Sequence, residues 1–415
     1  MYFLYNLIVI SASAILKALA LTNTKLSLFV NGRRETISLI NQKISKEDKV
    51  IWIHAASLGE YEQGLPVIEK LKDQHPSHKI LLTFFSPSGY EVKKDSKVAD
   101  CICYLPMDTK SKVNSFLTAA HPDIAIFIKY EIWPNYLLKL KKNDIPTFLI
   151  SALFKENQIY FKWYGGFMRK AMTQFTHIFV QNEKSKKLLS SFGNLTNVTI
   201  AGDTRFDRVS EILERNNELD FMKLFKNEQY CYVAGSTWPE DEKVIIDYIN
   251  QNNQPIKFVI APHTIKNSHI QEITGAISKK VMRYTEMDKA TLKDYDVLII
   301  DTIGILTKIY SYADVAYVGG GFATGLHNTL EPAVFGIPVI IGPQFEEFAE
   351  AEELVALGGV ISVHNYQSFQ KISDKCYTSN DYRLKVGNIN TTYIQEKAGA
   401  TNLIVSKLSS VFTSK

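Results

Sequence analysis

Short, uninterrupted apolar runs separated by segments of helical length constrain the fold of this chain more than any other feature. A run of Val, Ile and Leu bounded by turn residues is typical of a strand buried on both faces, and helices between such strands indicate parallel βαβ units. We therefore predict an α/β chain built from doubly wound parallel sheets. The predicted strands are 50–55, 80–86, 102–106, 124–130, 147–152, 177–182 and 198–203, then 230–236, 258–263, 296–301, 315–321, 338–343 and 359–363.

The length and one charged stretch divide this prediction into two domains. A chain of 415 residues exceeds one ordinary hydrophobic core. The charged stretch 208–229 separates the two series of strands. We expect a helix over residues 1–21, a first Rossmann-like domain over 22–210 and a second over 211–415, from which the last helix could return to pack on the first domain.

The first 21 residues are apolar apart from Asn6, Ser11, Ser13 and Lys17. A secretory signal would carry its positive charge before the apolar run, and here the first lysine is Lys17. As a helix this segment is roughly 30 Å long, barely enough to cross a bilayer. Asn6, Ser13 and Lys17 fall within about 40° of one another on that helix. This polar stripe favours a helix lying in the membrane interface over a span; the alternative is a helix packed on the first domain.

The charge and the cysteine content of the chain limit which partners and which cellular compartment it can have. Forty-seven Lys and Arg against 43 Asp and Glu give a net charge of +4, too small to indicate a nucleic-acid partner but suited to an anionic membrane surface or acidic substrates. The basic residues that follow the apolar segment favour the cytoplasmic side: Lys25, Arg33, Arg34 and Lys43. The four cysteines lack zinc spacing, so we expect buried free thiols, a reducing compartment and no metal.

Polar residues cluster after the predicted strands. Ligands of open α/β sheets bind outside the carboxyl ends of the strands, and two such domains facing a cleft form the layout of glycosyltransferases that use sugar nucleotides. Glu60 ends "HAASLGE", Glu131 lies in "KYEIWPN" and Arg205 in "GDTRFD". An arginine there could neutralise a leaving phosphate; the alternative for Glu131 and Arg205 is an ordinary salt bridge.

Two further segments have the chemistry of phosphate binding. In "GGGFATGLHNTLEPAVFGIPVIIGP" (319–343), glycines such as Gly320 and Gly321 permit close backbone approach, and a helix start near residues 329–332 offers free N–H groups. Glu331 there could accept both hydroxyls of a ribose, or it could simply stabilise the helix dipole while the glycines serve the turn. In "VAGSTWPEDE" (233–242), Ser236 and Thr237 could hold a phosphate or carboxylate, or could be a plain N-cap.

Together these motifs, in this order and spacing, resemble the 3-deoxy-D-manno-octulosonic acid (Kdo) transferases of Gram-negative bacteria over nearly the whole chain. The resemblance implies a two-domain GT-B fold anchored to the cytoplasmic side of the cell inner membrane. It implies transfer of Kdo from CMP-Kdo to the lipid A precursor, with inversion, without a metal or other cofactor. On the residues alone, a GT-B transferase using a UDP- or GDP-sugar, or a non-catalytic nucleotide-binding protein at the membrane, stays open.

The resemblance also assigns residues. Glu60 matches the general base, while Glu131 and Arg205 match positions thought to stabilise the transition state, the latter usually a lysine. His263 and Ile305 stand where the family often has Arg and Glu, so we expect backbone-mediated or weaker contacts there; Gly321 and Thr329 replace a usual Ser and Pro. We expect His54 to orient the loop before Glu60. The positions matching stretches that contact CMP are Pro262, His263, Ile303, Gly304, Ile305, Asn328, Thr329, Leu330 and Glu331.

Overall fold

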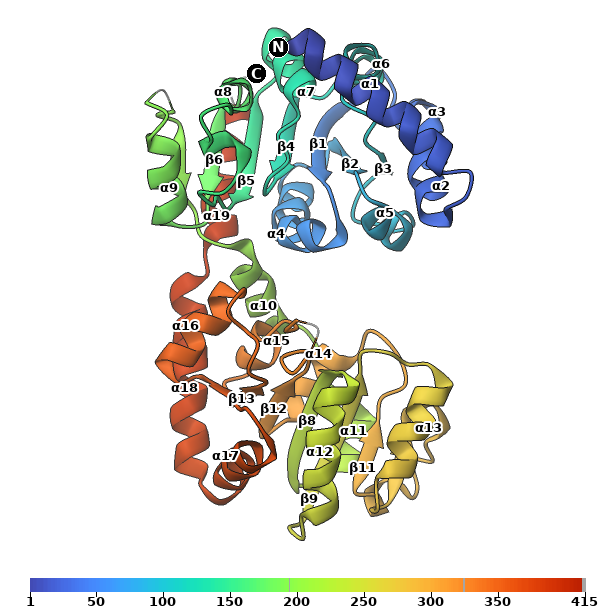
Figure 1. Ribbon diagram of the computed structural model, residues 1–415, viewed down its shortest axis with the longest axis vertical. Helices are drawn as coiled ribbons and strands as arrows, with labels where there is room; N and C mark the ends of the chain where they lie inside the picture. Colours follow the sequence, from blue (N-terminus) through green and yellow to red (C-terminus); the bar gives the residue numbers. More distant parts are fainter. Residues whose placement is uncertain (194, 324, 413–415) are drawn as a thin grey trace. The chain divides into compact units, whose positions relative to one another are not determined.

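The computed structural model describes residues 1–193, 195–323 and 325–412, and the chain divides into two compact units (Figure 1). Unit 1 comprises Met1–Arg208 with Lys397–Lys415, and unit 2 comprises Val209–Glu396. Each unit contains one seven-stranded sheet in which every strand pair is parallel. The predicted α/β fold of two Rossmann-like domains is therefore confirmed.

The sheet of unit 1 has the strand order β3-β2-β1-β4-β5-β6-β7. The chain starts in the middle at β1, builds outward to β3, and then crosses to β4 on the other side of β1. The order therefore reverses between β1 and β4. The strands are β1 (Lys49–Ala55), β2 (His78–Phe84), β3 (Cys101–Tyr104), β4 (Ile124–Ile128), β5 (Thr147–Ala152), β6 (His177–Val180) and β7 (Val198–Ile200).

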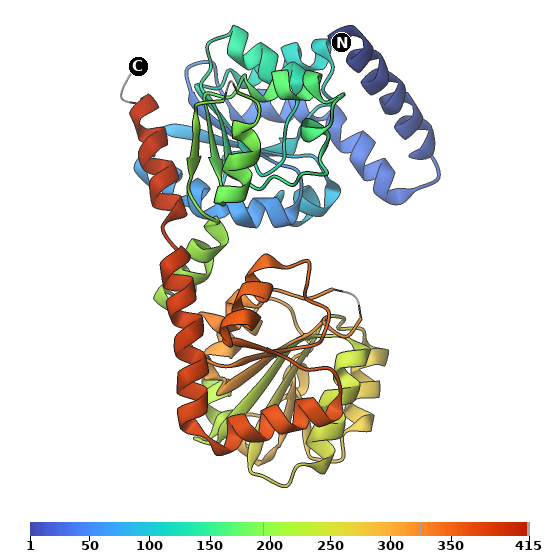
Figure 2. The same ribbon diagram turned by 60° about the vertical axis from the view of Figure 1, so that its left-hand side comes forward.

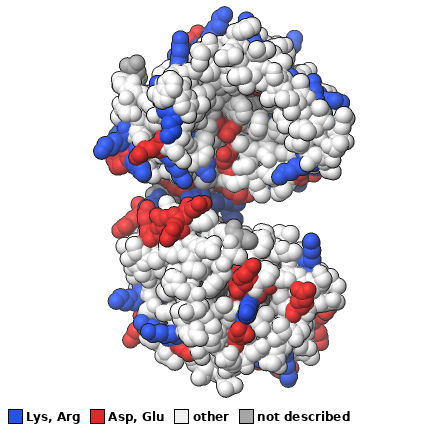
Figure 3. Space-filling model, in the orientation of Figure 1, with Lys and Arg blue, Asp and Glu red and all other residues white. Residues whose placement is uncertain are grey.

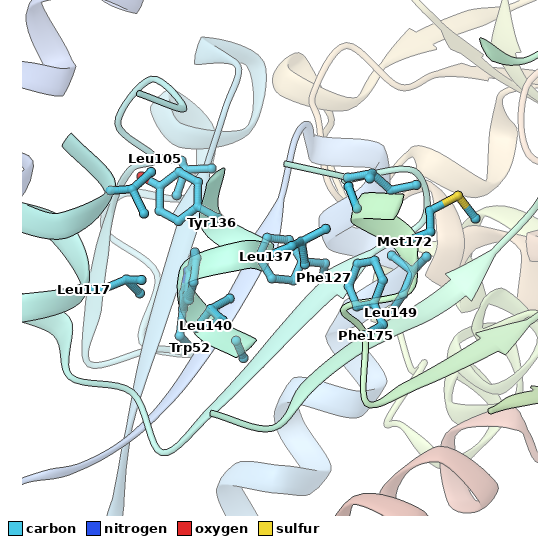
Figure 4. Close-up of a cluster of buried hydrophobic side chains, with 14 of the residues drawn as sticks. Trp52, Leu105, Leu117, Phe127, Tyr136, Leu137, Leu140, Leu149, Met172 and Phe175 are labelled. Atoms are coloured by element: carbon cyan, nitrogen blue, oxygen red, sulfur yellow. The ribbon is translucent and has the colours of Figure 1, made fainter. Parts of the chain in front are cut away.

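Helices cover both faces of this sheet, as the continuous apolar strands require. Successive side chains of a strand point to opposite faces, so Ile51 and Ile53 pack under α4 while Trp52 packs on the other face with Phe127 and Tyr136 (Figure 4). The elements are α1 (Tyr2–Leu19), α2 (Thr24–Asn31), η1 (Gly32–Arg34), α3 (Thr36–Lys43), α4 (Leu58–Gln74), α5 (Pro87–Lys93), α6 (Lys110–Ala120), α7 (Pro134–Lys142), η2 (Ile159–Phe161), α8 (Gly166–Met172), α9 (Glu183–Ser190) and α10 (Thr204–Glu214).

The C-terminal helix α19 (Ala400–Phe412) belongs to unit 1 (Figure 2, red). Its residues Ile404 and Leu408 pack with α4 in the core beside Ile51. The Asp207 carboxylate caps the start of the helix, because it accepts hydrogen bonds from the backbone N–H groups of Gly399 and Thr401. Unit 1 is therefore formed by two segments that are far apart in the sequence, residues 1–208 and 397–415.

The N-terminal helix α1 packs on unit 1 with its polar side and exposes an apolar side. Tyr5 donates a hydrogen bond to Asp108 (2.8 Å), and the Asn6 amide bonds to Asn135 (3.2 Å) and to the backbone N–H of Lys110 (3.0 Å). The side of α1 that carries Asn6 therefore faces the protein, as the alternative of a helix packed on the first domain requires. The exposed apolar side chains are Phe3, Leu4, Leu7, Ile8, Ile10, Ile15 and Leu19.

Arg33, one of the basic residues that we expected to favour the cytoplasmic side, is a structural residue. Its side chain donates to the carbonyl oxygens of Leu105 (2.9 Å) and Phe85 (2.6 Å), and its guanidinium lies 3.6 Å from the ring centroid of Phe29. Burial lowers the pKa of this guanidinium to about 10. The side chain of Arg33 therefore joins η1 to the segments that follow β2 and β3.

The sheet of unit 2 has the order β10-β11-β9-β8-β12-β13-β14, which reverses between β8 and β12. Its strands are β8 (Tyr230–Thr237), β9 (Ile256–Pro262), β10 (Val281–Arg283), β11 (Val297–Ile299), β12 (Val315–Val318), β13 (Val339–Ile341) and β14 (Val360–Ser362). The edge strand β10 was missed, because its two apolar residues, Val281 and Met282, lie between Lys280 and Arg283 and form no apolar run. Its helices are α11 (Asp220–Lys226), α12 (Pro239–Gln251), α13 (Asn267–Ala276), η3 (Tyr284–Glu286), η4 (Leu292–Asp294), α14 (Leu306–Ile309), η5 (Tyr310–Tyr312), α15 (Leu330–Ala333), α16 (Ala349–Leu357), α17 (Tyr366–Thr378) and α18 (Asn380–Lys397).

The four cysteines are all buried and free. Burial raises the pKa of the Cys231 thiol to about 12, so this group stays protonated and unreactive. The prediction of buried free thiols is confirmed.

Candidate active site

The carboxyl ends of β1 and β4 carry the first group of predicted site residues. These two strands are neighbours, with His54 paired to Phe127, and the strand order reverses between them. The loops that leave a reversal point diverge and open a space above the sheet, which is where open α/β sheets bind ligands. Glu60 follows β1 and Glu131 follows β4, so the fold brings both carboxylates to this point of unit 1.

Glu60 lies in the first turn of α4, where its carboxylate turns back over the preceding loop. Its Oε2 accepts a hydrogen bond from the backbone N–H of Ala56 at 2.5 Å. Burial, and then the nearby charge of Glu131, raise the Glu60 pKa to about 7, against the opposing effects of backbone N–H groups and Lys129. A carboxyl that titrates near neutrality is suited to accept a proton in a reaction at physiological pH.

Glu131 is held by two donors from different parts of the chain. Its Oε2 lies 3.0 Å from His54 Nε2 and accepts a 2.8 Å hydrogen bond from Trp133 Nε1. Its side chain is only 11% exposed, so these bonds fix the orientation of the carboxylate while leaving Oε1 for another contact. An oriented, nearly buried carboxylate within electrostatic reach of Glu60 can stabilise positive charge that develops nearby.

His54 is fully buried and cannot itself take a proton from a substrate. Its Nδ1 contacts the carbonyl oxygen (3.0 Å) and hydroxyl (2.9 Å) of Thr83, so both ring nitrogens are used within the protein. We expected His54 to orient the loop before Glu60, and this expectation is wrong, because neither ring nitrogen contacts that loop. The residue that it orients is Glu131, which is 77 positions away in the sequence.

Lys129 and Tyr130 complete this group, and the sequence analysis did not single them out. Lys129 adopts a left-handed backbone conformation (φ 68°), unusual for a residue with a side chain, and its Nζ lies 5.2 Å from the Tyr130 ring centroid. Burial and then Glu60 raise the pKa of Tyr130, while Arg205 lowers it. Tyr130 therefore lies within electrostatic reach of two predicted site residues, and the sequence "KYE" was the available signal.

Arg205 lies at the start of α10 and is paired to Asp203. Its Nε and one terminal nitrogen each lie 2.8 Å from Asp203 Oδ2, and its side chain is 35% exposed. The backbone N–H of Arg205 donates to the other carboxylate oxygen (2.9 Å). The pair fixes the guanidinium at the edge of unit 1 and neutralises part of its charge.

The second group of predicted residues lies at the carboxyl ends of β8 and β12, the reversal point of unit 2. Ser236 has a left-handed backbone (φ 54°), which bends the end of β8. The Thr237 hydroxyl is buried and donates to Glu242 at 2.9 Å, so its side chain supports α12. Ser236 is therefore the residue of this pair whose side chain is left for another contact.

The glycines after β12 allow backbone segments to pack closely. A Cβ on Gly319 would lie 2.2 Å from the carbonyl oxygen of Ser236, and one on Gly321 would lie 2.7 Å from the backbone nitrogen of Gly342. The N–H of Gly320 donates to Asp241 at 2.8 Å. This N–H is not free for a phosphate, so the predicted glycine cradle is used in part by the protein itself.

Glu331 is fixed at the start of the short helix α15. Its two oxygens accept hydrogen bonds from Thr307 (2.9 Å) and Asn328 (3.2 Å). Leu330 and Thr329 are buried beside it, and the Thr329 hydroxyl has no hydrogen-bond partner among the residues that the structure describes. Asn328 and Glu331 thus present their polar groups at this edge, whereas Leu330 can offer a ligand only its backbone.

Three aromatic rings meet at the same edge of unit 2. The Trp238 and His263 rings stack with centroids 4.4 Å apart and planes 17° apart, and Trp238 Nε1 donates to His327 Nε2 at 3.1 Å. An indole N–H can only donate, so His327 Nε2 is unprotonated and the ring is neutral. Burial, and then His263, lower the His327 pKa, in agreement with this state.

The remaining predicted residues lie in the neighbouring loops. Pro262 ends β9 and is followed by His263, whose N–H donates to the Thr237 carbonyl oxygen (2.9 Å). Ile303 is 82% exposed, Gly304 has a left-handed backbone (φ 95°), and Ile305 immediately precedes α14. The Ile303 side chain therefore lies at the surface of this loop.

The sequence of unit 1 matches a family model. The model is described as 3-deoxy-D-manno-octulosonic-acid transferase (kdotransferase) and covers residues 31–208. The 3-deoxy-D-manno-octulosonic acid transferase of Rickettsia bellii is 30% identical over 308 residues, covering 72% of each chain. The one of Haemophilus influenzae is 25% identical over 434 residues, 98% of this chain and 97% of that one.

Two further comparisons concern length and fold. The chain is 24% identical over 394 residues to a bifunctional glycosyltransferase/methyltransferase of Fusobacterium nucleatum, and the alignment spans 60% of that protein and 92% of this chain. The structure resembles UDP-GlcNAc 2-epimerase from Neisseria meningitidis bound to UDP-GlcNAc, with a TM-score of 0.60 and 17% identity over 87% of this chain and all of that one. At this identity the likeness concerns the fold alone, and it places both units in the GT-B class.

Proposed function

The chain belongs to the 3-deoxy-D-manno-octulosonic acid (Kdo) transferase family and is a glycosyltransferase, and from this premise we propose that it moves Kdo from CMP-Kdo to the lipid A precursor. Glu60 acts as the general base in this proposal, and the reaction inverts the anomeric carbon. The donor, the acceptor and the roles of Glu60, Glu131 and Arg205 are inferred from the family resemblance, and the geometry of these residues supports the roles.

The proposed reaction is a single displacement. A hydroxyl of the acceptor attacks the anomeric carbon of Kdo, and its proton passes to the Glu60 carboxylate. The new carbon–oxygen bond forms as the bond from that carbon to the CMP phosphate oxygen breaks, and CMP leaves with the bonding electrons. The Glu60 pKa of about 7 supports this role, because a large fraction of the carboxyl is ionised at neutral pH and its proton affinity is still high.

Glu131 and the cations near it act on the charges of the transition state. Glu131 is oriented by His54 and Trp133, which supports a role in stabilising positive charge that develops on the sugar ring. Arg205 and Lys129 supply positive charge for the departing phosphate and for the carboxylate of Kdo. CMP carries a single phosphate with little charge to neutralise, so these residues suffice without a metal.

Unit 2 holds the nucleotide in this proposal. Glu331, fixed by Thr307 and Asn328, is positioned to accept the ribose hydroxyls, and Ser236 with the loop after β12 faces the phosphate. The Trp238–His263 stack presents a flat surface suited to a pyrimidine base. His263 thereby replaces a family arginine with a ring whose backbone N–H is already used.

We place the enzyme at the cytoplasmic side of the inner membrane, where a lipid acceptor would be available. Helix α1 is long and apolar enough to cross a membrane by length and composition, and its exposed apolar side would contact lipid. Deletion of residues 1–21 is expected to move the protein from the membrane fraction to the soluble fraction. A full-length protein found wholly in the soluble fraction would contradict this placement.

The observation that carries the proposal is the raised pKa of Glu60 beside a fixed Glu131, in the region that matches the family model. The test is Glu60→Gln, with Glu62→Gln on the same helix as the matched control. We expect Glu60→Gln to bind CMP-Kdo normally and to lose transfer to the lipid A precursor, measured by mass spectrometry of the lipid. Near-normal turnover by Glu60→Gln would remove it from the role of base.

The same transfer assay distinguishes CMP-Kdo from a UDP- or GDP-sugar as the donor. CMP is expected to inhibit the transfer, and UDP and GDP are not. Inhibition by UDP or GDP in place of CMP would favour the alternative of another sugar nucleotide, and binding of CMP without any transfer would favour a non-catalytic protein.

A further inference from the structure

A cavity of about 820 Å³ in unit 1 opens between α1, α6 and α7. It has an apolar and a basic lining. Tyr2 and Phe3 of α1 and Leu138 of α7 contribute apolar surface, and the lysines that line it are Lys110, Lys139 and Lys142. A cavity that combines these two linings has the character of a site for an anionic amphiphile.

The three lysines are available to an anion. None of them forms an ion pair within the part of the chain that the structure describes. The Tyr2 hydroxyl is a further donor, because it is buried and has no partner among those residues. The sequences of α1, α6 and α7 contain lysines and no Asp or Glu. The acid near the cavity is Asp108 in the loop before α6, whose carboxylate is occupied by hydrogen bonds from Tyr5, Asn135 and Tyr136. Figure 3 shows basic side chains along the margin of unit 1 where Figure 1 places these helices.

The position of α1 indicates that the anionic amphiphile is a membrane lipid. Hydrogen bonds of Tyr5 and Asn6 hold the polar side of α1 against unit 1, and ring contacts of Tyr2 and Tyr5 with Phe167 add to this. The opposite side exposes apolar residues from Phe3 to Leu19, a length of roughly 24 Å. With the enzyme at the membrane, as proposed above, a helix fixed in this way would lie along the membrane surface with its apolar side in the lipid. The cavity then opens beside the lipid at the level of the headgroups.

We propose that the cavity between α1, α6 and α7 binds the phosphate headgroup of one anionic phospholipid, with its acyl chains beside Phe3 and Leu138. Lys110, Lys139 and Lys142 bind the phosphate, and the Tyr2 hydroxyl donates a hydrogen bond to it. This site goes beyond the glycosyl transfer proposed above and does not depend on it, because a bilayer phospholipid is neither donor nor acceptor in that reaction.

Two adjacent lysines provide the test. Lys141 and Lys142 are neighbours on α7 and both are exposed, but only Lys142 lines the cavity. General attraction to an anionic surface is worth about 1 kcal/mol per lysine, about fivefold in partitioning, and would fall equally for Lys141→Gln and Lys142→Gln. For the full-length protein we expect the loss of partitioning onto phosphatidylcholine vesicles that contain phosphatidylglycerol to be at least severalfold larger for Lys142→Gln.

Native mass spectrometry gives an independent readout in detergent, where no membrane surface is present. We expect one phosphatidylglycerol molecule to stay bound to the wild type and to Lys141→Gln, and to be lost from Lys139→Gln/Lys142→Gln. Thermal unfolding of each variant checks that it is folded. Three results would overturn the proposal: equal losses for the two single variants, equal retention of phosphatidylcholine, or equally tight binding of soluble glycerol 3-phosphate, which would make the cavity a free-anion site.

Discussion

His54 Nε2 lies 3.0 Å from Glu131 Oε2, and this contact joins the first strand of the unit 1 sheet to the loop after the fourth. The histidine is fully buried and the carboxylate nearly so. One carboxylate at the candidate active site is therefore oriented by a side chain with no exposed surface, and we propose that His54 is a positioning residue.

His54→Ala is expected to lower kcat by about ten- to a hundredfold, with a smaller change in KM for the donor. Loss of one hydrogen bond to a carboxylate costs about 1.5–3 kcal/mol, and a tenfold change in rate corresponds to about 1.4 kcal/mol. His54→Gln, which can still donate to Glu131, should recover part of the rate. If both variants have the same kcat once thermal unfolding shows that both are folded, His54 has no positioning role.

The pH dependence of transfer should report the Glu60 carboxyl. As a base it acts only when ionised, so kcat/KM is expected to rise with pH up to about 7 and then to level off. The charge of Glu131 raises the Glu60 pKa, so Glu131→Gln should move the rising limb to lower pH while the maximal rate falls. If the rise of kcat/KM in Glu131→Gln occurs at the same pH as in the wild type, or at higher pH, the two carboxylates are not electrostatically coupled.

Glu60→Gln is expected to stabilise the folded protein at pH 8 and to leave its stability nearly unchanged at pH 4. The pKa of Glu60 rises from 4.5 to about 7 on folding, so between these values the folded state holds a proton that the unfolded state has released. Stability contributed by this group is therefore present below pH 4.5 and is lost as the pH rises through about 7. Glutamine does not titrate, and the gain at pH 8 should be about 2 kcal/mol.

Urea unfolding of the wild type and Glu60→Gln at both pH values measures this difference. Glu62→Gln is the control, since Glu62 lies on the same helix and its ion pairs with Lys93 and Arg208 are partly exposed. A Glu60→Gln variant that is less stable at pH 8 would mean that the ionised carboxylate stabilises the fold, contrary to the burial of this group.

Glu331→Gln is expected to weaken CMP binding by about tenfold or more, because hydrogen bonds to a charged group are worth about 1.5–3 kcal/mol. Thr307→Val keeps the carboxylate and removes one of the bonds that orient it, so its effect should be smaller. Titration calorimetry with CMP measures both variants. Unchanged CMP affinity in Glu331→Gln would reduce Glu331 to a residue that stabilises the start of α15.

The sequence by itself determined where most strands lie and which polar residues follow their carboxyl ends. Short, continuous and β-branched apolar runs such as 124–130, bounded by turn residues, favour strands of a two-sided sheet, so β4 and its neighbours were predictable without knowledge of the rest of the chain. For the same reason, Glu60 and Glu131 could be placed at carboxyl ends of strands. The three-residue strand β10 lies at an edge, where little apolar surface is needed, and the sequence pattern did not reveal it.

Only the tertiary structure decided which of these groups meet. The contact of His54 with Glu131 depends on the crossing of the chain from β3 back to β4 beside β1, and no local pattern encodes that crossing. The helical period of residues 1–21 predicted a polar stripe, but whether Asn6 faces lipid or protein depends on partners on α6 and α7 more than a hundred residues away. Periodicity identifies the faces of an element, whereas long-range packing determines what each face contacts.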